Sequence, residues 1–338
     1  MNIKLTNIRS LKAKEYNLEK QTTILIGANG CGKSTIIEAL YFCCFFKSSR
    51  TSITKEMVTY EEEYANIATS FKDESIEVNF YKGKVGLLHN LNEVKAKNIL
   101  NQFDVILIEP ELIEIINKGP ALRRNFINRN LVQVDKDFLD LQIKYNNLTK
   151  TRNKFLKFND YDKDYHLTVN QMADQINEQI VSQKKRYIQR LEDTTNKILK
   201  WITDSKEEIN LVYEQLVVDK DSRLLREQKY KSSLFGNHLD DMLILLNGKS
   251  LKKFGSSGQR RTVAISLMLG HMNIMHIDKG TYPLVLIDGI HAEIDKNRQE
   301  KLHSLLQNKT NVIIATPDIS NINTKILEDP NTQVISMD

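Results

Sequence analysis

Cysteine is scarce in this sequence, and long apolar runs are missing altogether. The three cysteines are Cys31, Cys43 and Cys44. Their spacing does not match a metal site, and two adjacent cysteines seldom form a disulfide. No apolar run approaches the roughly 20 residues that cross a bilayer, and the first residues lack the basic-then-apolar pattern of a signal peptide. We therefore expect a protein of the reducing cytoplasm, without a membrane partner.

Proline and glycine are rare in the middle of the chain. Between residues 111 and 205 they occur only as Gly119 and Pro120, so few breaks interrupt helical structure there. We predict two long antiparallel helices joined by a polar loop at 159–164, with a period near 3.5 that favours coiled-coil-like pairing. The apolar residues at helical spacing are Phe138, Leu141, Tyr145, Leu148 and Phe155, then Ile176, Ile180, Tyr187, Leu191, Ile198 and Ile202.

Neither sign of charge dominates the composition. Lysine and arginine number 48 against 43 acidic residues, which gives a net charge of +5. This balance permits nucleic acid as a partner, and a solvated lysine-rich surface explains it equally well. No aromatic residues are interleaved with the basic clusters, as they are in a platform for stacking single-stranded bases. Contact with a duplex backbone is therefore the favoured form of DNA binding.

What the sequence does contain is a phosphate-binding loop. The apolar run Thr22–Ile26 predicts a buried strand, which stops at the first glycine of Gly-x-x-x-x-Gly-Lys-Ser. A helix with apolar periodicity follows, and this strand-loop-helix context is what the motif requires. Loop N–H groups and the positive end of the helix then face one phosphate. The candidate nucleotide-binding residues are Gly27, Ala28, Asn29, Gly30, Cys31, Gly32, Lys33, Ser34 and Thr35.

The two polar residues of the motif have separate expected roles. Lys33 bridges the β- and γ-phosphates, and Ser34 offers its hydroxyl to Mg²⁺, so ATP and Mg²⁺ are the expected cofactors. The alternative is an ordinary glycine-rich turn with a chance lysine. For Cys31, oxidation that blocks nucleotide binding is one interpretation, and a passive small residue is the favoured one.

Two further motifs follow in the second half of the chain. The segment Gly255-Ser256-Ser257-Gly258-Gln259 precedes an apolar helix predicted at 261–277, and it makes a second anion-receptive helix start. The alternative is an ordinary cap, since serine and glycine are common before a helix. The apolar run 284–288 predicts a buried strand that ends in Asp288, with Glu293 shortly after. A carboxylate at that position holds Mg²⁺ in P-loop enzymes.

Other segments predict the remaining strands and turns. They are the strands 2–6, 105–108, 208–213, 311–316 and 333–337, a hairpin over 75–88 that turns at Lys82-Gly83, and a hairpin that follows 242–246 at Asn247-Gly248.

The three nucleotide motifs, with more than 200 residues between the first and the second, resemble an ABC-type ATPase of the SMC and recombination class. The flanking residues narrow this to a resemblance to the RecF family that covers most of the chain. They are Asn7-Ile8-Arg9, Ser49-Arg50-Thr51, Pro110-Glu111, residues 119–128, residues 131–135, Tyr145, Arg152-Asn153, His238 and Asp240-Asp241. This resemblance implies an α/β ABC/SMC-type ATPase head with an inserted helical arm. We expect head segments at 1–110 and 208–338 and the arm at 111–207.

The RecF resemblance also implies roles and partners. RecF-like proteins bind ATP, dimerise on it, hold duplex DNA near single-strand gaps and, with RecR, help to place RecA on single strands. They act in DNA repair, recombination, replication and the SOS response. Carried over here, Ser256, Gly258 and Gln259 reach the γ-phosphate bound to the other subunit, and Asp288 organises Mg²⁺. Lys33, Asp288 and Glu293 are the candidate catalytic residues.

Two positions, Gly289 and Leu112, depart from the family pattern, and a third, Thr316, is consistent with it. The family usually carries Asp-Asp where this chain has Asp288-Gly289, and glycine cannot orient the attacking water. We therefore predict slow hydrolysis with binding retained, because positioning a nucleophile is worth several kcal/mol. Glu293 and His291 are the candidates to replace the missing group. Leu112 stands where the family tends to have aspartate, and Thr316 stands where transporter relatives place histidine.

The candidates for contact with DNA phosphates are Arg50, Arg123, Arg124, Lys184, Lys185, Arg186, Lys252, Lys253, Arg260 and Arg261. The alternatives stay open: Arg123 and Arg124 as structural ion-pair partners, and residues 184–186 as a solvated helix face. Two rival functions are a non-hydrolysing nucleotide-sensing scaffold and an ATP-binding subunit of a membrane transporter.

Overall fold

The computed structural model describes residues 1–71, 74–99, 103–158, 163–216, 225–227, 229–289 and 294–337. The chain divides into two units: Met1–Glu111 with Gly280–Asp338, and Leu112–Lys279. Residues 208–279 therefore group with the long helices, whereas the sequence assigned them to the ATPase head. The boundaries of the compact units therefore differ from those of the predicted domains.

The helix α1 (Lys33–Phe45) forms the centre of the first unit and packs against strands of both of its sheets. Ten of its 13 residues are buried, which fits a helix that is apolar on nearly every side. Ile36, Ala39 and Phe42 join one apolar core with residues from the two sheets.

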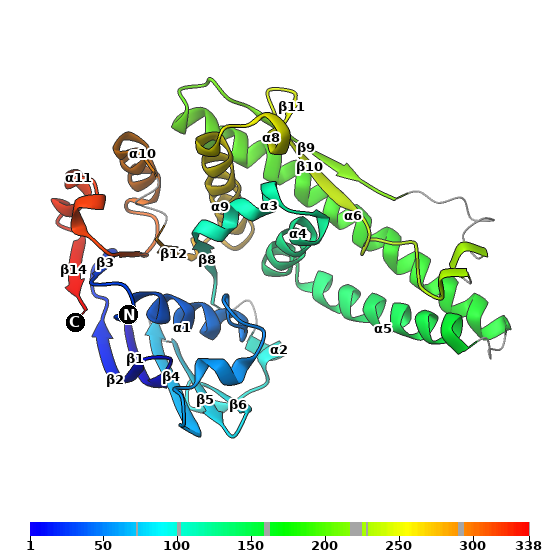
Figure 1. Ribbon diagram of the computed structural model, residues 1–338, viewed down its shortest axis with the longest axis horizontal. Helices are drawn as coiled ribbons and strands as arrows, with labels where there is room; N and C mark the ends of the chain where they lie inside the picture. The colour runs from blue at the N-terminus through cyan, green and yellow to red at the C-terminus, as the bar shows by residue number, and fades with distance from the viewer. Residues whose placement is uncertain are drawn as a thin grey trace. The chain divides into compact units, whose positions relative to one another are not determined.

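A five-stranded parallel sheet carries the nucleotide motifs (Figure 1). Its order is β14 (Thr332–Ser336), β3 (Thr22–Ile26), β13 (Val312–Thr316), β12 (Leu284–Asp288) and β8 (Val105–Ile108). The predicted apolar runs occupy these strands, because parallel strands are buried on both faces. The expected α/β fold is confirmed. The carboxyl ends of β3 and β12 bring the glycine-rich loop and Asp288 to the same edge of the sheet.

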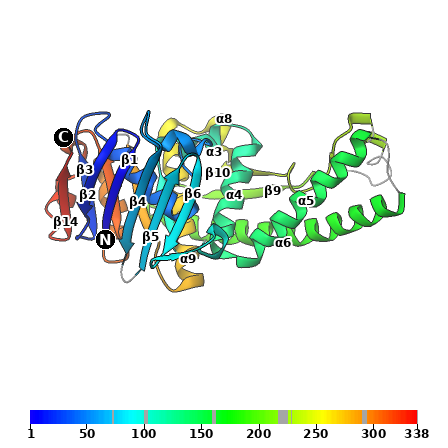
Figure 2. The ribbon, with the colours of Figure 1, turned by 90° about the horizontal axis from the view of Figure 1, so that it is seen from below.

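A six-stranded antiparallel sheet forms the other layer of this unit (Figure 2). Its order is β2 (Leu11–Asn17), β1 (Asn2–Ile8), β4 (Tyr64–Phe71), β5 (Glu74–Tyr81), β6 (Lys84–His89) and β7 (Asn92–Glu93). The predicted hairpin turn is confirmed, because Lys82 and Gly83 both have positive φ, +47° and +78°. Strands β2 and β4 were not predicted. Strand β2 is mostly exposed and polar, so it carries little apolar signal.

The shorter helices of the first unit are η1 (Thr54–Met57), α2 (Ala96–Ile99), α10 (Lys296–Leu306), η4 (Ile319–Asn321) and α11 (Thr324–Leu327). The 3-10 helix η2 (Pro110–Ile113) runs across the boundary in sequence between the two units.

The second unit is built on two long helices, α5 (Lys136–Phe158) and α6 (Lys163–Ile202), which pack along each other (Figure 2). The predicted helical pair is confirmed. The second half of α6 continues past α5 and packs on α9 (Ser257–Lys279). Ile180, Leu191 and Leu199 of α6 are at most 1% exposed, so its apolar stripe is buried over most of its length.

A small sheet completes the second unit, in the order β11 (Lys249–Ser250), β10 (Asp241–Leu246) and β9 (Ile209–Glu214). The predicted Asn247-Gly248 turn joins β10 and β11 with φ of +48° and +76°. The remaining helices are α3 (Glu114–Asn117), α4 (Pro120–Val134) and α8 (Leu251–Phe254). In the described part of the chain, every helix is too short or too polar to cross a membrane.

Candidate nucleotide site

The loop between β3 and α1 is shaped by close backbone approaches. A Cβ on Gly27 would lie 2.2 Å from the carbonyl oxygen of Met337, whose own N–H bonds to Ile26. Gly32, the residue before α1, has φ of +103°, and a Cβ there would lie 2.6 Å from Leu11. Glycine is required at both positions, because any side chain would displace the neighbouring segments.

The ammonium of Lys33 lies inside this loop. Lys33 is only 7% exposed, and its Nζ donates to the carbonyl oxygens of Gly27 and Ala28, both at 2.7 Å. The Cys31 sulfur is 3.6 Å from the same nitrogen. The positive charge is therefore held at the first turn of α1, where the helix also presents its unpaired N–H groups.

Ser34 joins the loop to the end of strand β12. Its hydroxyl donates to Asp288 Oδ1 at 3.0 Å. Burial raises the pKa of Asp288, and the Ser34 bond and the Arg50 charge act in the opposite direction. A hydroxyl and a carboxylate in contact are the oxygen donors that Mg²⁺ takes. Within the described residues no group of three His, Cys, Asp or Glu forms a metal cluster, so phosphate oxygens and water would complete the coordination of the ion.

The loop, Ser34 and Asp288 line a cleft of about 1630 Å³ within the first unit. Arg9 and Arg50 line the same cleft, as does the segment from Lys55 to Glu63. The cleft is large enough for a nucleoside triphosphate, and five cationic residues line it: Arg9, Lys33, Arg50, Lys55 and Lys82.

Gly289 follows Asp288 in a left-handed conformation, with φ of +70°. A Cβ at this position would meet Pro110 at 3.7 Å, an ordinary contact distance. Among the described residues, the space beside Asp288 therefore admits a side chain, and the obstacle to one is the backbone conformation. The two predicted substitutes, His291 and Glu293, lie outside the described residues.

The second predicted anion-receptive helix start, at Ser256, lies in the second unit. Ser256 and Gln259 bond reciprocally: the Ser256 N–H donates to Gln259 Oε1 at 2.9 Å, and the Gln259 N–H donates to Ser256 Oγ at 3.2 Å. This is a capping box at the start of α9. Gln259 Nε2 also donates to Glu207. Ser256 is exposed and Gly258 is half-buried, so the predicted γ-phosphate contact from another subunit stays a prediction that this geometry permits.

For two of the predicted DNA-binding residues the prediction is wrong, because both are buried. Arg123 is 7% exposed and forms a bidentate ion pair with Asp241, with nitrogen to oxygen distances of 2.7 and 2.9 Å. Lys184 is 1% exposed and donates to Asn237 Oδ1 at 2.9 Å. Burial lowers the pKa of Lys184 to about 8. Neither side chain can reach a DNA phosphate, because each is used inside the protein.

The other basic candidates are more accessible. Lys185, Arg186, Lys252 and Lys253 are exposed, as is Arg50, while Arg124, Arg260 and Arg261 are half-buried. Arg124 donates to the carbonyl of Asp240, and Arg260 donates to Asn117. The half-buried arginines are thus partly committed to contacts within the second unit.

The structure also locates Leu112, which departs from the family pattern, and Thr316, which is consistent with it. Leu112 is buried in η2 at 7% exposure. Thr316, at the end of β13, donates to the carbonyl of Asp318 at 3.0 Å.

The site also contains a bonded group that was not predicted, made of Glu38, Ser48 and Arg9. The only signal for it in the sequence is Glu38, a single acidic residue in an otherwise apolar helix.

The comparisons with known proteins agree with this geometry. The family model of the RecF/RecN/SMC N-terminal domain matches residues 1–325. The DNA replication and repair protein RecF of Staphylococcus aureus (strain USA300) is 28% identical, over 97% of this chain and 95% of that protein. The RecF of Pediococcus pentosaceus is 27% identical over the same shares.

Solved structures extend the likeness to three dimensions. A structure of the recombination mediator RecF with ATP, from the RecFOR pathway, is 26% identical, with a TM-score of 0.85 over 95% of this chain and 92% of that one. An Smc head domain from Pyrococcus furiosus is 16% identical with a TM-score of 0.54, over 95% of this chain and 91% of that one, and it shows likeness of fold alone.

Proposed function

Because this chain belongs to the RecF/RecN/SMC N-terminal domain family, we propose that it is an ATP-binding recombination mediator of the RecF kind, acting in DNA replication and repair. The observation that carries the proposal is the contact between Ser34 and Asp288 beside the loop that holds Lys33. Similarity to RecF proteins over 97% of the chain supports the assignment.

Nucleotide binding is the first step of the proposed function. The loop N–H groups and Lys33 hold the phosphates of ATP, and Ser34 with Asp288 holds Mg²⁺, which neutralises phosphate charge and polarises the γ-phosphoryl group when bound. The relative solved with ATP supports ATP as the nucleotide. Hydrolysis is slow, because Gly289 offers no side chain to orient water.

Dimerisation on ATP is the second step. The exposed Ser256 at the start of α9 presents a hydroxyl and free helix N–H groups, which contact the γ-phosphate held by another copy of the chain. The dimer holds duplex DNA near single-strand gaps through the exposed Lys185 and Arg186, and it acts with RecR to aid the loading of RecA. One solved relative is described as a recombination mediator of the RecFOR pathway, and this supports the RecR part of the proposal.

Size measurement tests the proposal. By light scattering with ATP, with ADP and without nucleotide, we expect doubling of mass only with ATP. Lys33→Ala should abolish the doubling, because the phosphates lose their cation. Lys20→Ala, at an exposed lysine in the turn before β3, is the matched control and should dimerise normally. A monomer under all conditions, or a Lys33→Ala variant that still doubles, would contradict the proposal.

A second candidate function is a non-hydrolysing nucleotide-sensing scaffold, which the glycine at position 289 favours. An ATP turnover assay with and without duplex DNA separates the two functions. Weak turnover supports the mediator, and none at all supports the scaffold. The similarity to RecF proteins over 97% of the chain disfavours the transporter alternative.

A further inference from the structure

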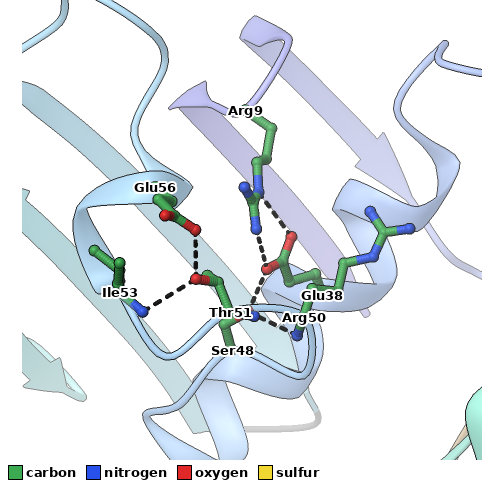
Figure 3. A network of polar contacts seen from close by, with 7 residues as sticks. All are labelled: Arg9, Glu38, Ser48, Arg50, Thr51, Ile53 and Glu56. Carbon is green, nitrogen blue, oxygen red and sulfur yellow. Dashed lines mark hydrogen bonds and ion pairs between the residues drawn. The ribbon is translucent and has the colours of Figure 1, made fainter.

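A buried carboxylate supports the wall of the nucleotide cleft. Glu38 in helix α1 is 1% exposed, and a carboxylate at that depth is tolerated only when it is paired and hydrogen-bonded. Arg9 donates to its two oxygens through Nε at 3.1 Å and Nη2 at 2.8 Å, and the Ser48 hydroxyl donates to the same carboxylate (Figure 3). The Glu38 contact raises the pKa of Arg9.

The backbone of Arg9 is fixed as tightly as its side chain. Arg9 has a left-handed φ of +53° in the turn between β1 and β2. Its N–H donates to the Met57 carbonyl at 2.8 Å, and its carbonyl accepts from the Thr59 hydroxyl at 2.8 Å. Arg9 therefore ties Glu38 to the end of the 3-10 helix η1.

A second line of bonds leads from Glu38 to the start of the same helix. Ser48 Oγ accepts from the N–H groups of Arg50 at 2.9 Å and Thr51 at 3.0 Å, a turn closed by a serine side chain. Thr51 Oγ1 accepts from the Ile53 N–H and donates to Glu56 (Figure 3). The bonds form a closed ring from Glu38 through the 48–51 turn to η1, and back through Arg9.

The side chain of Arg50 points away from this ring (Figure 3). It is exposed and lines the cleft together with Lys33 and Asp288. The guanidinium charge also acts to lower the pKa of Asp288. Within the described residues no acceptor bonds this guanidinium. Arg9, by contrast, is already neutralised by Glu38, so of the two arginines that line the cleft Arg50 is the one available to phosphates.

We propose that Ser48 and Glu38 are positioning residues for nucleotide binding, because they hold the 48–51 turn so that Arg50 faces the polyphosphate bound by the same subunit. This inference rests on the proposed function and deepens it. It assigns Arg50 to nucleotide, whereas the sequence grouped it with the DNA candidates. A planar guanidinium suits this role, since it binds phosphate oxygens in pairs.

A double-mutant cycle of Ser48→Ala and Arg50→Ala tests the inference, with ATP affinity measured by equilibrium titration. Each single variant should weaken ATP binding about tenfold, the effect of losing one charge-assisted contact. If Ser48 acts through Arg50, adding Ser48→Ala to Arg50→Ala should cause no further loss. Ser49→Ala, the neighbouring serine, is the matched control and should bind ATP like the wild type.

Glu38→Gln provides a second probe of the ring. It leaves the charge of the half-buried Arg9 unpaired and is expected to lower the thermal unfolding midpoint, whereas Ser48→Ala keeps the Arg9–Glu38 pair and should stay folded. In the folded fraction, Glu38→Gln should likewise show no further loss on the Arg50→Ala background.

The outcomes separate this inference from the function on which it rests. An equal weakening by Ser48→Ala with and without Arg50, or no weakening at all, would overturn the positioning role. Wild-type protein that fails to bind ATP, or Lys33→Ala protein that binds it normally, would overturn the proposed function and the inference with it.

Discussion

At the scale of single residues, the buried charged side chains matter most for stability. Glu38, Lys184 and Arg123 are all less than 10% exposed, and each is stabilised by hydrogen bonds inside its own unit. Removing one member of such a pair leaves an uncompensated charge, which costs several kcal/mol. Arg50 and Lys185, for which we propose contacts with nucleotide and with DNA, remain exposed.

One prediction at the scale of a single residue concerns Gly289 and the rate of ATP hydrolysis. Gly289→Asp should raise ATP turnover by at least about tenfold, because a carboxylate would orient the attacking water. The left-handed φ of +70° makes the change cost about 1–2 kcal/mol of stability. Steady-state phosphate release measures the gain, and urea unfolding measures the cost.

Gly289→Asn is the matched control for that experiment. It carries nearly the same shape and backbone cost but cannot act as a base, so its turnover should stay at the wild-type level. Wild-type hydrolysis that is already vigorous, or equal gains from Asp and Asn, would show that another group positions the water.

Single residues also show where sequence inference stops. Lys33, Ser34 and Asp288 could be predicted, because a motif fixes their spacing along the chain and parallel strands bring their ends together. The Arg9–Glu38–Ser48 contacts could not, since no motif links positions that come together only after folding. The burial of Lys184 was missed because its neighbours Lys185 and Arg186 point to solvent on the same helix.

Secondary-structure elements were predicted best where their apolar pattern was strong. The buried parallel strands and the two long helices follow their patterns closely. Strand β2 was not predicted, because it is an edge strand whose side chains are mainly exposed. The capping box at α9 is written in the sequence as Ser-x-x-Gln, and it realises the cap that the sequence offered as the alternative to an anion site.

Ser256 lets the capping of α9 be separated from its proposed contact with nucleotide. Ser256→Asp should keep the helix capped, because aspartate is as good an N-cap as serine, so the unfolding free energy should stay within about 0.5 kcal/mol of wild type. The new negative charge would face the γ-phosphate of the other subunit and should abolish ATP-dependent dimerisation.

Ser256→Ala supplies the opposite comparison. Losing the cap should lower the unfolding free energy by about 1 kcal/mol, whereas dimerisation should weaken less than in Ser256→Asp, because no repulsion is added. Chemical denaturation and light scattering measure the two effects. Normal dimerisation of Ser256→Asp would contradict the contact across subunits.

The whole molecule is divided differently by packing than by motif order. Residues 208–279 carry the capped helix α9, which packs along α6, and so they group with the long helices. Sequence order alone suggested that the chain returns to the head after the arm. The packing of α9 could not be foreseen, because the partner of an apolar helix face is not written in its own periodicity.

The prediction at the scale of the whole molecule concerns DNA binding. Lys185 and Lys197 are both exposed on α6, and only the first belongs to the basic cluster proposed to contact duplex phosphates. In the ATP-bound dimer, Lys185→Ala should weaken duplex binding and reduce the slope of log affinity against log salt by about 0.9, the value for one lost phosphate contact. Lys197→Ala removes the same charge from the same helix and should leave both quantities unchanged. Equal effects of the two variants, measured by fluorescence anisotropy across a salt series, would show a general charge effect and remove the 185–186 cluster from the DNA interface.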